Sequence, residues 1–249
     1  MPRVLCIANQ KGGVGKTTTA ISLAVGISKA GARTLLIDLD PQCNATTGLG
    51  FAPATAHPLA SGEPITSATL RTATPNLEIL PGSRKFGDIE ILTRSDETKV
   101  ERMKEQLNQE LNGYDFVLID CPPSLEQLTQ IALAGSTEVI MPIQCEYFAM
   151  KGLEQMIEVI KKVMVQKPDR LQFGGIVETM YDYSLELTYE VDKEVRDFFG
   201  EIVFQTVIPR DVKFSEASSY GQSILDYDPR SRGARAYVEL CLEILERVS

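Results

Sequence analysis

The chain has few side chains that could hold a structural metal. It contains one histidine, His57, and five scattered cysteines, none of them spaced as a C-x-x-C pair. Zinc and redox sites need several such side chains at short, regular spacing. We therefore expect neither kind of site, and we interpret Cys6 and Cys121, which lie in or beside apolar segments, as small buried thiols.

Long apolar runs and an excess of basic residues are also absent. No apolar stretch approaches the ~18–20 residues of a membrane span. The first apolar segment follows Met1 so closely that no room is left for a signal or transit peptide. These features predict a cytoplasmic protein. The formal net charge of −9 argues against a uniformly basic nucleic-acid-binding protein but allows a local basic patch.

The length and composition suit one well-buried α/β domain. The chain has 249 residues, 43% of them hydrophobic and 24% charged, and no linker divides it, so we predict a single domain over residues 1–249. Apolar runs predict strands over residues 4–8, 34–38, 77–80, 116–120, 138–141, 173–177 and 203–207. Helical periodicity appears over residues 17–29, 97–111, 125–134, 150–165, 188–199 and 234–248.

The alternation of strands and helices predicts the fold class. The strands are continuously apolar, which is typical of a mostly parallel twisted sheet with helices on both faces. Ligands on such sheets bind beyond the carboxyl ends of the strands. Residues 48–76 lack clear periodicity and are rich in small residues, so we expect a mobile surface excursion there, with His57 exposed and without a role.

A glycine-rich segment with the sequence KGGVGKTTT follows the first predicted strand and opens a helix. Its glycines can adopt positive φ and let the main chain approach phosphate oxygens at the positive end of the helix dipole. Lys16 is then expected to reach the β- and γ-phosphates, and the Thr17 hydroxyl to hold Mg²⁺. The predicted nucleotide cradle consists of Lys11, Gly12, Gly13, Val14, Gly15, Lys16, Thr17 and Thr18.

The loop departs from the general P-loop pattern at two positions. Gln10 stands where that pattern has its first glycine, and a second lysine, Lys11, lies inside the loop. Lysine is a flexible, strongly hydrated point charge, so Lys11 could project away from its own loop toward another phosphate. Alternatively, Lys11 is a solvated loop lysine.

Three aspartates follow predicted strands at the same edge of the sheet. Asp120 ends an apolar run, from which it can reach Mg²⁺ through a coordinated water; alternatively, it caps the next helix. Asp38 and Asp40 point to the same side of an extended segment, and a carboxylate there can orient an attacking water. Alternatively, Asp40 merely opens the turn at Pro41.

The loop resembles the deviant Walker A loop of the ParA/MinD ATPases. Residues 35–42 (LLIDLDPQ) resemble the second motif of that family, and residues 116–123 (FVLIDCPP) resemble its Walker B strand. The likeness continues through residues 206–210, 215–217 and 227–231. It covers nearly the whole chain and favours the chromosomal Soj/ParA branch.

The resemblance implies roles for several residues. Lys11 would cross a dimer interface to the partner's nucleotide, Asp40 would position the attacking water, and Asp38 would support Mg²⁺ or the loop. The implied catalytic residues are Lys11, Lys16 and Asp40, and the implied metal site is Thr17, Asp38 and Asp120. Adenine recognition falls on Pro209 and residue 211, where Asp211 replaces the family's asparagine and loses an amide donor.

The resemblance also implies partners: a homodimer on Mg·ATP, non-specific double-stranded DNA on the nucleoid, and a ParB-like activator. DNA binding would rest on phosphate neutralisation by basic residues near the C-terminus, for which the candidates are Arg210, Lys213, Arg230, Arg232 and Arg235. Alternatively, these side chains are solvated or salt-bridged. The arginine that the family usually carries after residues 180–182 is absent here.

Three alternative functions would use all or part of the same ATP chemistry. The same ATPase could position a protein cargo, such as a chemotaxis cluster or a microcompartment, because the partner chooses the cargo. A MinD-like membrane regulator would use a basic amphipathic C-terminal helix, but the polar face of the last predicted helix carries Glu239, Glu243 and Glu246. A cluster-binding metabolic ATPase would need bridging cysteines, a pattern that Cys121 and Cys145 do not present.

Overall fold

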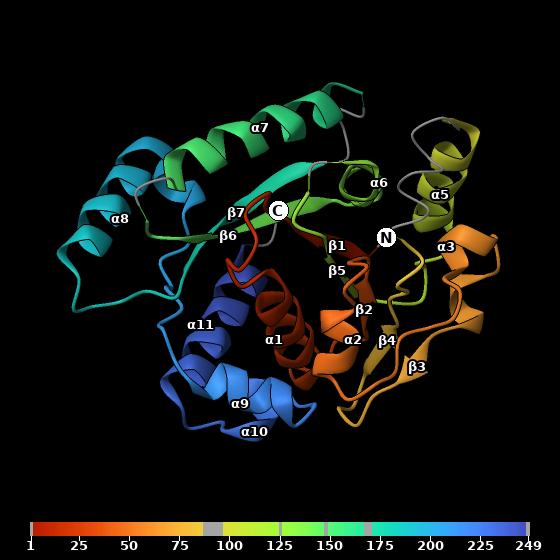
Figure 1. Ribbon diagram of the computed structural model, residues 1–249, viewed down its shortest axis with the longest axis horizontal. Coiled ribbons are helices and arrows are strands. Elements are labelled where there is room, and N and C mark those ends of the chain that lie inside the picture. The colour runs from red at the N-terminus through yellow and green to blue at the C-terminus, as the bar shows by residue number, and fades with distance from the viewer. Residues whose placement is uncertain (1, 87–96, 125, 147–148, 167–170, 248–249) are drawn as a thin grey trace.

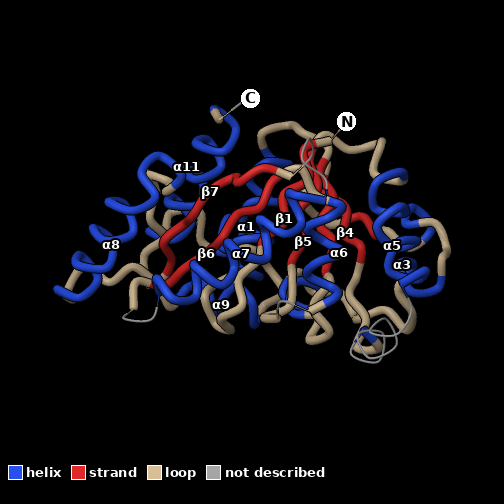
Figure 2. Tube along the Cα trace, turned by 90° about the horizontal axis from the view of Figure 1, so that it is seen from above, coloured by secondary structure: helices blue, strands red, loops and turns tan. Residues whose placement is uncertain are grey.

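The computed structural model describes residues 2–86, 97–124, 126–146, 149–166 and 171–247. Within them, a seven-stranded sheet has the strand order β3-β4-β2-β5-β1-β6-β7 (Figures 1 and 2). All its neighbours are parallel except β3, which pairs antiparallel with β4. The strands are β1 (Arg3–Ile7), β2 (Thr34–Asp38), β3 (Leu70–Arg71), β4 (Leu77–Leu80), β5 (Phe116–Asp120), β6 (Glu138–Gln144) and β7 (Gln172–Thr179).

Helices cover both faces of the sheet (Figure 1). One face carries α3 (Pro58–Ser61), α5 (Glu97–Gln109), α6 (Gln127–Gly135), α7 (Ala149–Gln166) and α8 (Glu186–Phe199). The other carries α1 (Lys16–Lys29), α2 (Asn44–Gly48), α9 (Lys213–Ser219), α10 (Ile224–Tyr227) and α11 (Arg232–Glu246). Two short 3₁₀ helices, η1 (Ile65–Ser67) and η2 (Gly200–Ile202), complete the described elements.

Alternate residues of the strands supply two separate cores. In β1, Val4 and Cys6 belong to the cluster under α5 to α8, whereas Leu5 and Ile7 belong to the cluster under α1 and α11. Because both faces are buried, the strands read as continuous apolar runs rather than alternating ones. The predicted fold class is therefore confirmed, and the carboxyl ends of β1, β2, β5, β6 and β7 meet at one edge of the sheet.

The predicted strand over residues 203–207 was wrong. Val203 forms only an isolated parallel bridge with Ile176 of β7. The backbone N–H groups of Gln205 and Thr206 donate to the two carboxylate oxygens of Glu243 on α11, at 2.8 and 3.1 Å. These N–H groups do not bond to a strand, because the carboxylate of Glu243 accepts from them instead.

The expectations for residues 48–76 and for His57 were also wrong. The segment contains α3, η1 and β3, and Leu59 and Ile65 are fully buried. His57 is 1% exposed, its Nδ1 accepts from the backbone N–H of Leu59 at 3.3 Å, and its ring lies 4.3 Å from that of Phe86. Burial lowers the pKa of His57 to about 3, so this histidine is a neutral helix cap in the core.

Candidate nucleotide-binding site

The glycine-rich loop lies between β1 and the N-terminus of α1. Gly13 and Gly15 have φ values of 76° and 84°, a left-handed conformation that favours glycine. At Gly15 an added Cβ would lie 3.7 Å from the side chain of Thr179, an ordinary contact, so the positive φ is what favours glycine there. The loop thus has the positive φ values that the sequence predicts, and it leads directly into a 14-residue helix.

Two residues that the sequence analysis did not single out hold the loop against the neighbouring strands. Asn9 donates from its side-chain amide to Pro142 O of β6 at 2.8 Å and accepts from the backbone N–H of Lys11 at 3.0 Å. Thr179, the last residue of β7, donates to Val14 O at 2.8 Å. Their positions at the carboxyl ends of strands are the only sequence signal that could have indicated them.

The two loop lysines point to different places. Lys16 is buried, and its ammonium donates to Lys11 O at 3.0 Å. Burial lowers the pKa of Lys16, although the neighbouring carboxylates of Asp120 and Asp40 oppose that change. Lys11 is half-exposed and forms an ion pair with Glu146, in the loop after β6. Lys16 lines the cavity at the loop, whereas Lys11 and Glu146 are not among its lining residues.

Thr17 and Asp120 meet where Mg²⁺ is expected. The Thr17 hydroxyl donates to Asp120 Oδ2 at 2.8 Å, while Asp120 Oδ1 is buried without a hydrogen-bond partner among the described residues. Burial, with the nearby carboxylate of Asp38, raises the pKa of Asp120 well above its ordinary value. An orphaned buried carboxylate oxygen beside a hydroxyl fits a hard cation that also takes phosphate and water oxygens.

Asp38 and Asp40 differ in their surroundings. Asp38 is fully buried, and its carboxylate accepts from Asp40 N at 3.2 Å and from the N–H and hydroxyl of Thr46 at 2.8 and 2.6 Å. Burial raises the pKa of Asp38 to about 6. Asp40 lines the nucleotide cavity, and its Oδ1 accepts from Gln42 N at 2.8 Å. Asp38 thus supports the loop that carries Asp40.

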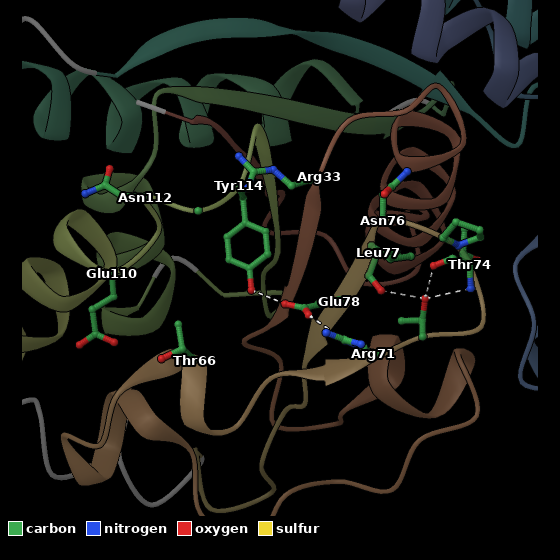
Figure 3. Close-up of a pocket in the computed structure, with 13 residues that line it drawn as sticks. Arg33, Thr66, Arg71, Thr74, Asn76, Leu77, Glu78, Glu110, Asn112 and Tyr114 are labelled. Atoms are coloured by element: carbon green, nitrogen blue, oxygen red, sulfur yellow. Dashed lines mark hydrogen bonds and ion pairs between the residues drawn. The ribbon is translucent and has the colours of Figure 1, made fainter.

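These residues enclose a cavity of about 290 Å³. It is lined by Gly12, Gly13, Gly15, Lys16, Thr17, Thr18, Asp40, Gln42, Asn44 and Pro123. A larger cavity of about 580 Å³ lies at the amino end of β4 (Figure 3). There the polar groups pair with one another, as when Tyr114 donates to Glu78 at 2.6 Å. Only the smaller cavity brings the phosphate loop, Asp40 and the start of α1 together.

A further cavity, of about 450 Å³, is lined by the residues expected to contact adenine. It is lined by Tyr181, Asp182, Tyr183, Ser184, Pro209, Arg210, Asp211, Val212 and Arg232. Pro209 pairs with Tyr181 through an isolated parallel bridge just beyond β7. Tyr181 comes two residues after Thr179, which donates to the phosphate loop. The Asp211 carboxylate accepts from the backbone N–H groups of Lys213 and Gly233, at 3.0 and 3.2 Å. Asp211 therefore anchors the start of α11 beside this cavity.

Four of the five predicted DNA-binding residues carry exposed charge. Arg210, Arg230, Arg232 and Arg235 are exposed, and none of them pairs with a carboxylate within the described part of the chain. Lys213 differs, because its ammonium is 2.6 Å from the Glu216 carboxylate. The acidic neighbours are engaged locally, as with Asp226, which pairs with Lys29.

Cys6 and Cys121 are small buried thiols, as the sequence predicts. Cys6 and Cys121 are fully buried with their sulfurs 3.3 Å apart, and Cys145 donates to the buried carboxylate of Glu178. None of the helices that the structure describes has the length and apolar character to span a bilayer.

Comparisons with known proteins agree with this geometry. A family model described as an AAA domain matches residues 2–173. The chain is 44% identical to the chromosome-partitioning ATPase Soj of Treponema pallidum, over 99% of this chain and 98% of that protein. It is 43% identical to the chromosome partitioning protein ParA of Caulobacter vibrioides, over 98% of this chain and 94% of that one.

A solved structure of a similar protein contains a nucleotide and magnesium. Cobyrinic acid a,c-diamide synthase from Mycobacterium smegmatis, with bound ADP and magnesium, is similar to this fold with a TM-score of 0.84 and 33% sequence identity, covering 99% of this chain and 95% of that one. In this chain the Thr17 hydroxyl and the Asp120 carboxylate lie together beside the loop, and both are oxygen ligands of the kind that Mg²⁺ takes.

Proposed function

The chain belongs to the ParA/MinD family of ATPases, in its ParA/Soj partitioning branch, and from this premise we propose how its ATP site is used. It is an ATPase with ATP and Mg²⁺ as cofactors. The proposal is a molecular switch: residues 1–249 act as one domain that dimerises on Mg·ATP, binds DNA non-specifically and releases it after hydrolysis. The output is the partitioning of a chromosome or plasmid.

The observation that carries the dimer is the direction of Lys11. Lys11 is not among the residues that line the cavity with Lys16, and its ammonium pairs with Glu146 instead. A lysine in that position has the reach of a flexible four-carbon stem and can exchange its carboxylate for a phosphate of an opposing subunit. We infer that each Lys11 contacts the partner's nucleotide.

Within one subunit, the remaining residues divide the work of hydrolysis. Lys16 and the loop N–H groups neutralise and orient the phosphates, and Thr17 and Asp120 hold the magnesium. Asp40 orients the attacking water, an assignment supported by its place on the cavity wall next to the loop. Pro209 and Asp211 border the adenine, with Asp211 acting through the backbone it anchors.

The exposed arginines near α11 support DNA binding. Arg210, Arg230, Arg232 and Arg235 are available for phosphates because acidic neighbours such as Asp211 and Glu216 are already bonded. Lys213 contributes only after leaving Glu216. Dimerisation doubles the number of basic residues, so the affinity for DNA follows the nucleotide state. The protein is then cytoplasmic, associates with the nucleoid when it holds ATP, and leaves it when a ParB-like partner stimulates hydrolysis.

The packing of α11 favours DNA over a membrane as the surface that is bound. Its apolar residues Tyr237, Leu240 and Ile244 are buried, and the Tyr237 hydroxyl lies 2.9 Å from that of Thr19 on α1. An amphipathic membrane helix needs a free apolar face. A protein cargo in place of DNA cargo would leave the ATPase site unchanged, so pull-down with the ATP-bound dimer is the experiment that identifies the partner.

Sedimentation with Mg·ATP tests the dimer. The Asp40→Ala variant is expected to retain ATP and accumulate as a dimer, and adding Lys11→Gln is expected to return it to monomer while ATP binding stays largely intact. A dimer that survives Lys11→Gln contradicts the role of Lys11. Fast hydrolysis by Asp40→Ala would reassign the orientation of water to another residue.

A further inference from the structure

Lys11 is held within its own subunit at three points. Its backbone N–H donates to Asn9 Oδ1 at 3.0 Å, and Asn9 is fixed to β6 through Pro142 O. Its carbonyl accepts from Lys16 Nζ at 3.0 Å. Its ammonium pairs with Glu146, which follows the same strand β6. The backbone of Lys11 is therefore tied to β6, and only its side chain can move without disturbing the loop.

We propose that Glu146 is an intramolecular latch that retains Lys11 on its own subunit and so sets the threshold for dimerisation. This inference rests on the proposed function, because it requires that Lys11 serves the partner's nucleotide. Dimerisation then includes an exchange of counter-ions in which each Lys11 leaves a carboxylate of its own chain for a phosphate of the other subunit.

The exposure of the pair makes this exchange feasible. The side chains of Lys11 and Glu146 are 42% and 47% exposed, so water and salt weaken their attraction. A buried pair would hold the lysine too strongly to be released. A triphosphate carries several negative charges, whereas Glu146 supplies one, so the ammonium favours the phosphate once the two subunits meet.

Lys16 connects the backbone of Lys11 to the nucleotide. Its ammonium has three donors, and one of them goes to Lys11 O, so the other two can still reach a phosphate. The carbonyl of Lys11 can therefore stay bonded when a nucleotide binds, and the exchange of counter-ions is confined to the Lys11 side chain.

The expected effect follows from the worth of an exposed ion pair. Such pairs change an equilibrium constant by about 1.4- to 5-fold. A symmetric dimer opens two latches, so the effect is squared. In the Asp40→Ala background with Mg·ATP, Glu146→Gln is expected to tighten the dimer dissociation constant by about 2- to 25-fold.

Sedimentation equilibrium at low and high salt tests the latch. Glu101→Gln is the matched control, because it removes the same charge from a lysine pair whose carboxylate is exposed, here with Lys104 on α5. Both substitutions remove one negative charge from each subunit. The control therefore measures the part of the gain that comes from weaker repulsion between the two acidic subunits. The gain from Glu146→Gln is expected to exceed that of the control at low salt and to shrink as salt rises.

The possible outcomes separate the latch from the dimer itself. If Asp40→Ala stays monomeric with Mg·ATP, the proposed function fails. If it dimerises and Glu146→Gln matches Glu101→Gln at every salt concentration, only the latch is rejected. A weaker dimer in Glu146→Gln also rejects the latch, because Glu146 then contributes a contact to the partner.

Discussion

The buried charges of the nucleotide site are unequal in number. Lys16 is buried close to the carboxylates of Asp120 and Asp40, and a third buried carboxylate, that of Asp38, lies near Asp120. An excess of buried negative charge is unfavourable unless a cation neutralises it. We expect a magnesium ion beside Asp120 to supply that cation, which would leave Lys16 for the phosphates.

Removing the Lys16 ammonium tests this balance. Lys16→Gln is expected to weaken ATP binding by about 30-fold or more, because truncating one member of a buried charge pair costs about 2–5 kcal/mol. Titration with a fluorescent ATP analogue measures the affinity. Lys161→Gln, on the exposed side of α7, changes the net charge equally and is expected to bind as the unmodified chain does. Equal affinities for Lys16→Gln and the control would contradict the phosphate role of Lys16.

Thr46 positions the loop that carries Asp40. Its hydroxyl donates to Asp38 at 2.6 Å and accepts from Gly82 N at 2.8 Å, joining the ends of β2 and β4. Thr46→Val is expected to lower kcat on the order of 10- to 100-fold with little change in KM for ATP, because the loop loses its registration while the phosphate cradle stays intact. Steady-state phosphate release measures both constants. Thr46→Ser keeps the hydroxyl and is expected to restore kcat; failure of that rescue would contradict the role.

The sequence predicted the positions of those site residues that lie next to their own strand. The glycine loop, Thr17 and Asp120 follow from local pattern, because a parallel sheet collects the carboxyl ends of its strands at one edge. Asn9, Thr179 and Glu146 were missed because each acts on a partner more than 130 residues away in the chain. No spacing rule connects such pairs before the order of the strands is known.

At the scale of elements, a buried polar network joins β6, β7 and α8. Glu178 of β7 accepts from the Cys145 thiol at 3.2 Å and pairs with Arg196 of α8 at 2.8 Å. Arg196 also pairs with Asp192, which accepts from the Tyr181 hydroxyl at 3.0 Å. The network thus ties β7, which contacts the glycine-rich loop through Thr179, to α8, which follows the cavity lined by Tyr181 and Pro209.

The Glu178 carboxyl gives this network a pH dependence. Burial raises its pKa from an ordinary 4.5 to about 7. The folded chain therefore binds more protons than the unfolded chain between these values, and the stability contributed by Glu178 is full below pH 4.5 and is lost as the pH rises to 7. The unmodified protein loses this contribution as the pH rises, and Glu178→Gln does not. The difference in unfolding free energy between the two proteins is therefore expected to shift in favour of Glu178→Gln from pH 5 to pH 8. Urea denaturation measures this difference, and a difference that is constant with pH would contradict it.

Two errors of the sequence analysis belong to this scale. Residues 203–207 are apolar enough for a strand, yet Glu243 of α11 takes their backbone donors. His57 lies in a segment of small residues, yet it caps α3 inside the core. In the first case a distant side chain takes the backbone donors, and in the second the cap is local while the ring of Phe86 packs against His57 from further along the chain.

At the scale of the molecule, positive charge is concentrated against an acidic whole. The net charge is −9, while the exposed arginines at 210, 230, 232 and 235 lie around α10 and α11. Non-specific DNA binding depends on the number of phosphates neutralised, and the logarithm of the binding constant falls with the logarithm of salt by about 0.9 for each. A symmetric dimer counts every such residue twice.

Removing two of these arginines tests the DNA surface. In the ATP-bound Asp40→Ala dimer, replacing Arg230 and Arg235 by alanine removes up to four phosphate contacts, so the salt slope is expected to fall by up to about 3.6. Replacing Arg33 and Arg71, which line the cavity at the amino end of β4, lowers the net charge equally and is expected to leave the slope unchanged. Fluorescence anisotropy with two duplexes of unrelated sequence, across a series of salt concentrations, measures both. An equal loss in both variants would make the overall field, rather than the residues near α11, the source of binding, and no binding by the unmodified dimer at low salt would reject DNA as the partner.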